Sequence, residues 1–121
     1  VVLLSRLTGD YGGNFTVWPG SHTFFENYFK EHGHRVLGEG MPQVDLPNGP
    51  RQLTGEPGDA ILAHHQIVHT AAPNASCHIR YAAIFRLRHK ACEEIGHDAY
   101  TDIWREWPGI RDALAESTVA G

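Results

Sequence analysis

The stretch IRYAAIFRLRH at residues 79–89 constrains the fold more than any other part of this chain. In an extended strand, successive side chains point to opposite faces, so Arg80, Ala82 and Ile84 would share one face. The opposite face would hold Tyr81, Ala83, Phe85 and Leu87. A strand that is apolar on both sides is typical of the middle of a sheet whose two faces are covered. The sequence therefore predicts a sheet with this stretch near its centre.

Shorter runs predict the other strands, and clusters of Gly, Pro, Asn and Asp separate them. VVLLSRL at residues 1–7 and FTVW at residues 15–18 read as a hairpin joined by the turn TGDYGGN. AILAHH at residues 60–65 and IVHTA at residues 67–71 read as two further strands, before the turn APNAS.

One helix is predicted between the strands, within SHTFFENYFKEHG at residues 21–33. Thr23 and Glu26 have the spacing of a capping box, and Gly33 is a typical helix stop. The apolar side of this helix would hold Phe24, Phe25, Tyr28 and Phe29. The following residues 36–58 predict a long loop, with a brief strand near residues 51–54.

The C-terminal part predicts helices that pack on the sheet. Tyr100, Ile103, Trp104 and Trp107 follow the i, i+3, i+4, i+7 pattern of one helix face. Pro108 would end that helix and begin the next. Because strands dominate the pattern, we expect a mainly β fold, a sandwich or jelly roll with helices outside.

Composition narrows the class of protein. A chain of 121 residues with net charge −4 has no basic surface of the kind that binds nucleic acid, so no nucleic-acid partner is expected. No apolar run is long enough to span a membrane, which predicts no membrane partner. The start lacks methionine and the features of a signal peptide, and it resembles a strand cut from a longer protein. Two cysteines without a secretion signal predict free thiols and a cytoplasmic location.

Histidines and one arginine are the candidate functional residues. His64, His65 and His69 lie within six residues of one another, and imidazole is the commonest transition-metal ligand in proteins. Each could instead be an ordinary histidine at a strand end. Arg80 would point to an apolar strand face, which is costly without an anion, and a ligand carboxylate would fit its guanidinium. The alternative is an edge arginine that points to solvent.

Three ordered segments resemble the phytanoyl-CoA dioxygenase family of Fe(II)/2-oxoglutarate oxygenases. They are GGNFTVWPGSH, GDAILAHHQIVHTAAPN and HIRYAAIFRLRH, and the resemblance covers about residues 1–89. It implies a double-stranded β-helix (jelly roll or cupin-like) core, incomplete at its N-terminal end. It divides the chain into residues 1–89, the C-terminal part of the oxygenase domain, and residues 90–121, a helical extension that packs on the sheet.

The resemblance also implies roles for particular residues. His69 would be the distal iron ligand of a triad of two histidines and one carboxylate, and Arg80 would bind the far carboxylate of 2-oxoglutarate. His64 and His65 match no iron ligand of the family, so they would line the substrate cavity or pack beneath it. His22 closes the PGSH turn and has either a structural role or a place at the substrate.

The sequence departs from the family pattern at two places. The proximal motif, His-x-Asp or His-x-Glu, is absent, because no histidine is followed two residues later by an acid. The family often has a serine two residues after the distal histidine, where this chain has Ala71, so Thr70 or Ser76 would have to take its place at 2-oxoglutarate.

The leading hypothesis is part of an oxygenase that oxidises, most often hydroxylates, a small organic substrate while 2-oxoglutarate is decarboxylated. The isolated chain would then be inactive, since two iron ligands lie outside it. Its exposed strand edges would pair with the missing upstream segment or with another copy. One alternative is a catalytically inactive cupin-like binding module. Another is a different metal site, in which His64 or His65 joins His69.

Overall fold

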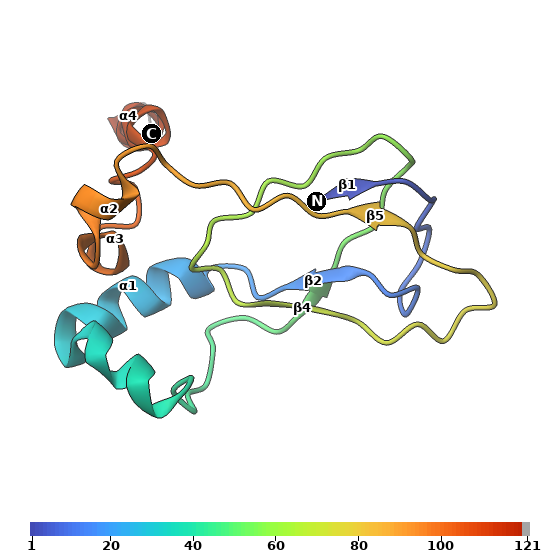
Figure 1. Cartoon of the computed structure of the whole chain (residues 1–121), viewed down its shortest axis with the longest axis horizontal. Helices are drawn as coiled ribbons and strands as arrows, with labels where there is room; N and C mark the ends of the chain where they lie inside the picture. The colour runs from blue at the N-terminus through green and yellow to red at the C-terminus, as the bar shows by residue number, and fades with distance from the viewer. Residues whose placement is uncertain (120–121) are drawn as a thin grey trace. The chain divides into compact units, whose positions relative to one another are not determined.

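The computed structural model describes residues 1–119, and the chain divides into two compact units. Unit 1 comprises Val1–His22 and Asp45–Leu87, and unit 2 comprises Thr23–Val44 and Arg88–Gly121. Unit 1 contains the strands, and most helical residues belong to unit 2 (Figure 1). Each unit is built from two separate segments of the chain.

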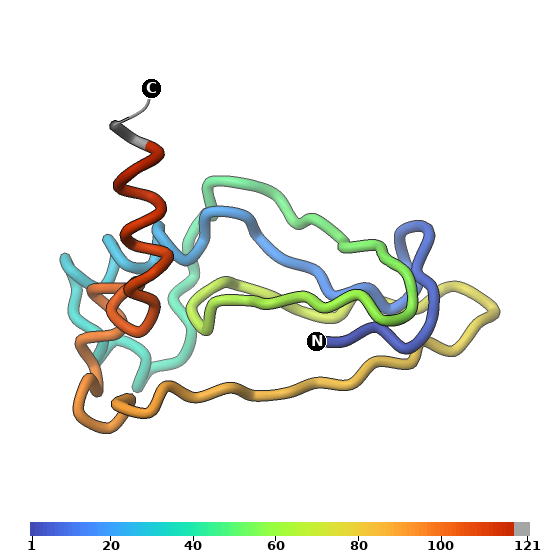
Figure 2. Tube along the Cα trace, turned by 90° about the horizontal axis from the view of Figure 1, so that it is seen from above, coloured from blue at the N-terminus to red at the C-terminus, as the bar shows by residue number. Residues whose placement is uncertain are grey.

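Unit 1 contains two small antiparallel sheets. In the first, β2 (Phe15–Val17) lies between β3 (Arg51–Gln52) and β4 (His69–Ala71). In the second, β1 (Val2–Leu3) pairs with β5 (Ala82–Ala83), so segments at opposite ends of unit 1 lie side by side (Figures 1 and 2).

The core of unit 1 combines apolar side chains with the hydrogen-bonded side chain of Asn14. Leu3, Leu7 and Val17 are buried, and Asn14 is 0% exposed. The Asn14 amide donates to the carbonyls of Gly9 (3.1 Å) and Leu53 (2.9 Å), and its Oδ1 accepts from Gly12 N–H (2.8 Å). Because all these groups are satisfied, Asn14 can be buried at little cost, and it fixes the loop before β2.

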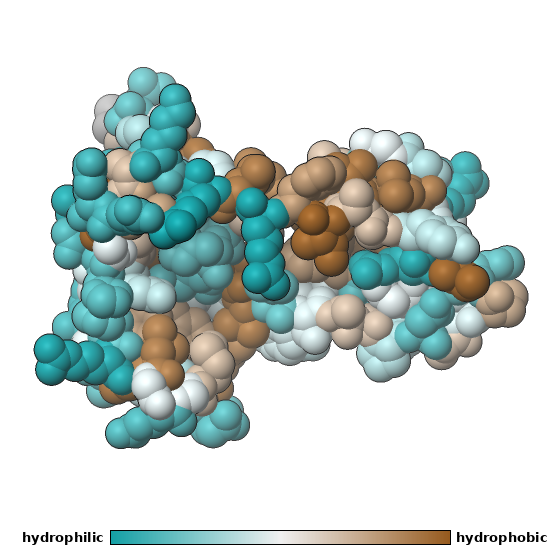
Figure 3. All heavy atoms as spheres, viewed as in Figure 1, coloured by the Kyte–Doolittle hydropathy of each residue, from teal (hydrophilic) through white to brown (hydrophobic). Residues whose placement is uncertain are grey.

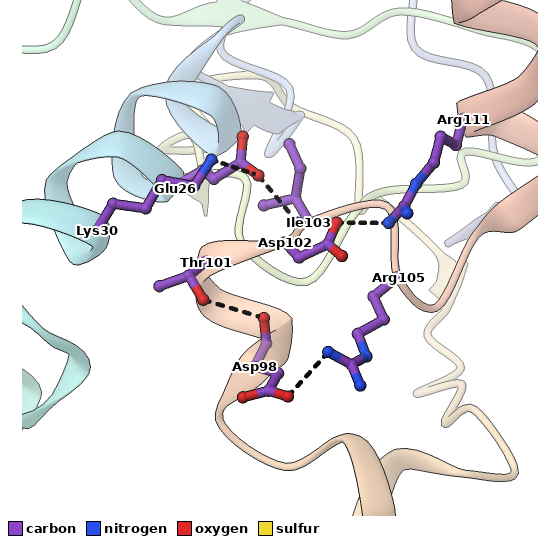
Figure 4. Close-up of polar contacts among 8 residues, drawn as sticks. All are labelled: Glu26, Lys30, Asp98, Thr101, Asp102, Ile103, Arg105 and Arg111. Atoms are coloured by element: carbon purple, nitrogen blue, oxygen red, sulfur yellow. Dashed lines mark hydrogen bonds and ion pairs between the residues drawn. The ribbon is translucent and has the colours of Figure 1, made fainter.

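Unit 2 is built around helix α1 (Ser21–His32), whose Phe25 and Phe29 are buried. Its other elements are the 3-10 helix η1 (His34–Glu39), α2 (Cys92–Ile95), α3 (Asp98–Thr101) and α4 (Pro108–Val119). Ile103, between α3 and α4, is 2% exposed, and its N–H donates to the Glu26 carboxylate at 3.3 Å. Figure 4 shows this bond beside the Glu26–Lys30 ion pair.

Short ion pairs hold the turn between α3 and α4. Arg105 pairs with Asp98 at 2.8 Å, and Arg111 pairs with Asp102 at 2.5 Å (Figure 4). All four side chains are at least 41% exposed, so each pair stabilises the turn only modestly.

The prediction of a mainly β, double-stranded β-helix fold is wrong. The structure is 31% helix and 15% strand, with one sheet of two strands and one of three, and its described residues form no jelly-roll barrel. The predicted hairpin of residues 1–7 and 15–18 is also wrong, because β1 and β2 belong to different sheets. Turn residues between two strands allow a hairpin but do not enforce it, and the longer-range β1–β5 pairing is the one formed.

The prediction of a long central strand at residues 79–89 is also wrong. Within residues 79–89 only Ala82–Ala83 form a strand, and this strand lies at the edge of a two-stranded sheet. The predicted strand at residues 60–65 is reduced to a bridge between Ala60 and Val2. Both stretches have the composition of covered strands, but among the described residues no further strand pairs with them.

Some of the predicted helix boundaries are confirmed and others are wrong. Helix α1 is followed by Gly33, as predicted, with a φ of 75°. The capping-box prediction is wrong, because the helix begins at Ser21 and the Glu26 carboxylate bonds to Ile103 instead. Pro108 begins α4 as predicted, but the expected helix over residues 100–107 is only the short α3 followed by turns.

Candidate functional site: a pocket beside Arg80

A shallow pocket of about 200 Å³ lies in unit 1, between the chain that follows β1 and the chain that precedes β5. Its lining consists of Ser5, Arg6, Leu7, Thr8, Gly9, Asp10, Gly12, Ser76, His78, Ile79 and Arg80. The lining mixes apolar surface with two arginines, a histidine, an aspartate and several hydroxyl and backbone groups.

Arg80 is half-buried at one side of this pocket, and its side chain lies against Gly13. A Cβ atom on Gly13 would be 3.6 Å from Cδ of Arg80, and Gly13 has a φ of 77°. Within the described part of the chain, Arg80 takes part in no ion pair and no side-chain hydrogen bond. Arg80 is therefore half-buried without an acidic partner among the described residues.

The other cation of the pocket, Arg6, does have an acidic partner. Its Nε lies 2.7 Å from the Glu56 carboxylate, and both side chains are more than half exposed. Asp10 also lines the pocket, but no ion pair joins it to Arg80. Since the Glu56 carboxylate offsets the charge of Arg6, Arg80 is the group best placed to bind a ligand anion.

Hydrogen bonds within the turn at residues 74–78 position two further residues of the pocket lining, Ser76 and His78. Asn74 Oδ1 accepts from the N–H of Ser76 at 3.0 Å and from its hydroxyl at 2.7 Å. The N–H of His78 donates to Ser76 Oγ at 3.2 Å, and the Asn74 amide donates to the His78 carbonyl at 2.8 Å. These bonds hold the turn in one conformation, so Ser76 and His78 face the pocket from a defined position.

His69, the predicted iron ligand, is exposed on β4 and is absent from the pocket lining. Its Nδ1 lies 2.9 Å from the Ile67 carbonyl, and its ring centre lies 5.2 Å from that of Phe15. A carbonyl only accepts, so Nδ1 is the donor of this bond, and Nε2 takes no part in it. This is the usual hydrogen bonding of a metal-binding histidine.

The positions of His69 and Arg80 can be compared through the residues that each contacts in and before strand β2. The cross-strand partner of His69 is Val17, and Arg80 lies against Gly13, four residues earlier. Gly13 lies in a bend before β2, with a φ of 77°, so the chain between these two contacts is not one continuous strand. Thr70, the next residue of β4, pairs with Thr16 and lies outside the pocket, whereas Ser76 lines it beside Arg80.

The remaining predicted residues form a separate group in unit 1. The ring centres of His22 and His64 are 6.0 Å apart, and those of His64 and His65 are 4.3 Å apart. The N–H of Gln66 donates to His64 Nδ1 at 3.1 Å, so His64 is neutral with its proton on Nε2. The Gln66 amide donates to the His22 carbonyl at 3.2 Å, and none of these histidines lines the Arg80 pocket.

The residues present do not fit a complete iron centre. Across residues 1–119, no group of three or more His, Cys, Asp or Glu side chains could hold a metal ion. His69 belongs to no such group among these residues, and neither His64 nor His65 completes a site with it.

Sequence reasoning missed three lining residues, Arg6, Asp10 and His78. Asp10 lies within the predicted turn before β2, where periodicity gives no orientation, and Arg6 lies near the end of the predicted strand that precedes this turn. His78 lies in the turn of residues 74–78, where strand alternation gives no orientation either.

No protein-family model, curated protein or solved structure matches this chain. In residues 1–119, none of the helices combines the length and the apolar character that crossing a bilayer requires.

Proposed function

We propose that this chain is part of an Fe(II)/2-oxoglutarate-dependent dioxygenase, in which Arg80 binds the far carboxylate of 2-oxoglutarate. The complete enzyme would oxidise a small organic substrate, most often by hydroxylation, with decarboxylation of 2-oxoglutarate. The observation that carries the proposal is the half-buried Arg80, which lines a pocket without a carboxylate partner among the described residues.

The chemistry of the pocket supports a carboxylate ligand. A guanidinium forms two parallel hydrogen bonds with a carboxylate, and partial burial strengthens both bonds. The stem of the Arg80 side chain lies against Gly13, on the side of the pocket that faces the loop before β2. His78 and Ser76 line the same pocket.

His69 would supply one ligand to the iron, through Nε2, because Nδ1 donates to the Ile67 carbonyl. Iron would bind the oxo-acid end of 2-oxoglutarate when the remaining ligands are present. The described residues do not supply those ligands, so the proposal assigns them to a part of the protein outside this sequence.

A second candidate is a binding module for a carboxylate, without catalysis. The lack of a three-ligand group among residues 1–119 favours it. We place either protein in the cytoplasm, because Cys77 and Cys92 are free thiols, which suits a reducing compartment.

Calorimetric titration of the purified chain with 2-oxoglutarate, in the presence of a chelator that removes metal ions, tests whether Arg80 binds the ligand carboxylate. Arg80→Ala should weaken binding by about 2 kcal/mol, or roughly thirtyfold, because the ligand carboxylate loses its charged donors. Arg51→Ala, an exposed arginine on β3, is the matched control and should leave the affinity unchanged. Equal affinities of the two variants would rule out the Arg80 assignment.

The same titration with Mn²⁺, a redox-stable substitute for Fe(II), separates the two candidates. Repeated on the complete protein, which would supply the remaining ligands, a dioxygenase should bind 2-oxoglutarate more tightly with the metal, and His69→Ala should abolish that increase. A binding module should show the same affinity with and without the metal.

A further inference from the structure

An Asn-Gly pair, Asn48–Gly49, lies in the segment of residues 47–50 that leads into β3. This segment consists of two prolines, the asparagine and the glycine, and it contains no helix or strand. Figure 3 shows brown, apolar spheres gathered where Figure 1 draws β1 and β5, which form the other sheet. All four residues of the segment are exposed, so water reaches the peptide bond between Asn48 and Gly49.

The Asn48 side chain continues the contact between β2 and β3 beyond their last strand pair, which is Val17 with Arg51. The same antiparallel register would place Pro19 opposite Gly49. Proline has no N–H to give to a strand pair. Instead, the Asn48 side-chain amide donates to the Pro19 carbonyl at 2.9 Å. This hydrogen bond, which we call the Asn48 latch, takes the place of a backbone hydrogen bond between the two segments.

Gly49 leaves the Asn48 side chain open to attack by the next backbone nitrogen. Glycine carries no side chain to shield that nitrogen, and no heavy atom lies within 4 Å of the position where a Cβ atom would be. Among the described residues, the N–H of Gly49 makes no hydrogen bond. Glycine is also the residue with the greatest backbone freedom to bring its nitrogen to the side-chain carbon of Asn48. The single neutral hydrogen bond of the Asn48 latch restrains the side chain only weakly.

We propose that Asn48 is a site of spontaneous deamidation, and that this modification releases the Asn48 latch. The backbone nitrogen of Gly49 loses its proton to hydroxide and forms a bond to Cγ of Asn48. The side-chain nitrogen takes a proton from water and leaves as ammonia, which regenerates the hydroxide. The resulting succinimide ring then takes up a water molecule, which breaks either of its two bonds from carbonyl carbon to nitrogen and gives aspartate or isoaspartate. No group is oxidised or reduced, and water is the only co-reactant consumed.

Both products remove the hydrogen bond of the latch. A carboxylate has no hydrogen to donate, and it would bring a negative charge to the Pro19 carbonyl oxygen that accepts the amide hydrogen of Asn48. Isoaspartate also lengthens the backbone just before β3. The end of the β2–β3 pair is therefore less stable in an aged chain than in a new one. The proposal is independent of the carboxylate pocket, because neither Asn48 nor Pro19 lines it.

The test incubates the full chain in mildly alkaline buffer and follows each asparagine by peptide mass spectrometry. We expect the mass change from amide to acid at Asn48 before any at the buried Asn14, at Asn27 in α1 or at the hydrogen-bonded Asn74, together with isoaspartate at position 48. Gly49→Ala should slow the conversion several-fold, and alanine fits there because the φ of Gly49 is not positive and no atom lies near. Equal rates at Asn48 and Asn74, or in the variant and the parent, would overturn the proposal.

Amide hydrogen exchange tests whether the modification releases the latch. Asn48→Asp reproduces one product and should speed exchange at residues 51–53 about fivefold, the equilibrium factor that corresponds to one net hydrogen bond. Exchange at Ala82–Ala83, in the other sheet, should stay unchanged, and aged parent chain should behave like the variant. Unchanged exchange at residues 51–53, or an equal increase in both sheets, would show that Asn48 does not fasten β3 and would contradict the proposal.

Discussion

Arg80 lies against Gly13, and a Cβ atom on that glycine would be 3.6 Å from Cδ and 3.7 Å from Cβ of the arginine. The two residues are far apart in sequence, and their contact positions the stem of the Arg80 side chain. The φ of Gly13 is 77°. Residues other than glycine rarely adopt such a conformation, so the contact depends on glycine.

Gly13→Ala should lower the free energy of unfolding by about 1 kcal/mol, because alanine is strained at a positive φ. The distance to Arg80 is an ordinary van der Waals contact, so strain and not a clash sets the cost. Gly9→Ala is the control, since no heavy atom lies within 4 Å of its Cβ position and its φ is not positive. Urea unfolding measures both, and equal stability would contradict the argument.

Asn14→Ala should cost about 3 kcal/mol of stability, because the side chain makes three hydrogen bonds in a fully buried position. Gly12 N–H and the carbonyls of Gly9 and Leu53 would lose their bonds to it. Asn27 is the control, at an exposed position of α1. Its replacement by alanine should change stability by no more than about 0.5 kcal/mol, as is usual for surface substitutions. A thermal melt that ranks the two variants in the opposite order would show that water replaces the lost bonds.

Ile103→Ala should destabilise the protein by about 3 kcal/mol through lost burial and a residual cavity. The wild-type side chain is only 2% exposed, whereas that of Ile110 in α4 is 38% exposed. Ile110→Ala should therefore cost less, about 1 kcal/mol, because it removes less buried apolar surface. Denaturant titration followed by tryptophan fluorescence compares them. If the two losses are equal, Ile103 is not part of the core of unit 2.

The isolated chain should form no iron-dependent succinate when it is supplied with Fe(II), ascorbate and 2-oxoglutarate. Among residues 1–119 no three-ligand group is present, and one imidazole does not hold Fe(II) in a defined geometry. Succinate formation that disappears in His69→Ala would show that the chain completes its own metal site. The side chains that bind the iron would then have to come together in a conformation different from the one described.

Local features of the fold were predictable from the sequence, because they depend on neighbouring residues. Gly33 follows α1, Pro108 begins α4, and a brief strand forms at Arg51–Gln52. The pairing of Val2 with Ala83 was not predictable, because alternation defines the faces of a strand but not its partner. The mainly β prediction failed for that reason: stretches with strand-like composition find few partners here.

The site was predictable in part. Alternation predicted that Arg80 shares a strand face with Ala82, and the structure places Arg80 in the pocket lining, outside β5. It could not show that Arg80 meets Gly13, because a glycine with positive φ in a loop follows no periodic pattern. His69 lies on a strand as predicted, but its separation from the pocket depends on the register of β4 with β2.

The hydrogen bond between Glu26 and Ile103 joins residues that are 77 positions apart. During synthesis, at roughly 5–20 residues per second, about 4–15 s pass between the addition of these two residues. Throughout that interval, Phe25 and Phe29 of α1 lack the C-terminal segment of unit 2, and their apolar surface is available to chaperones or to other nascent chains. The order of synthesis thus makes the aromatic face of α1 the part of unit 2 that stays exposed longest before the unit can close.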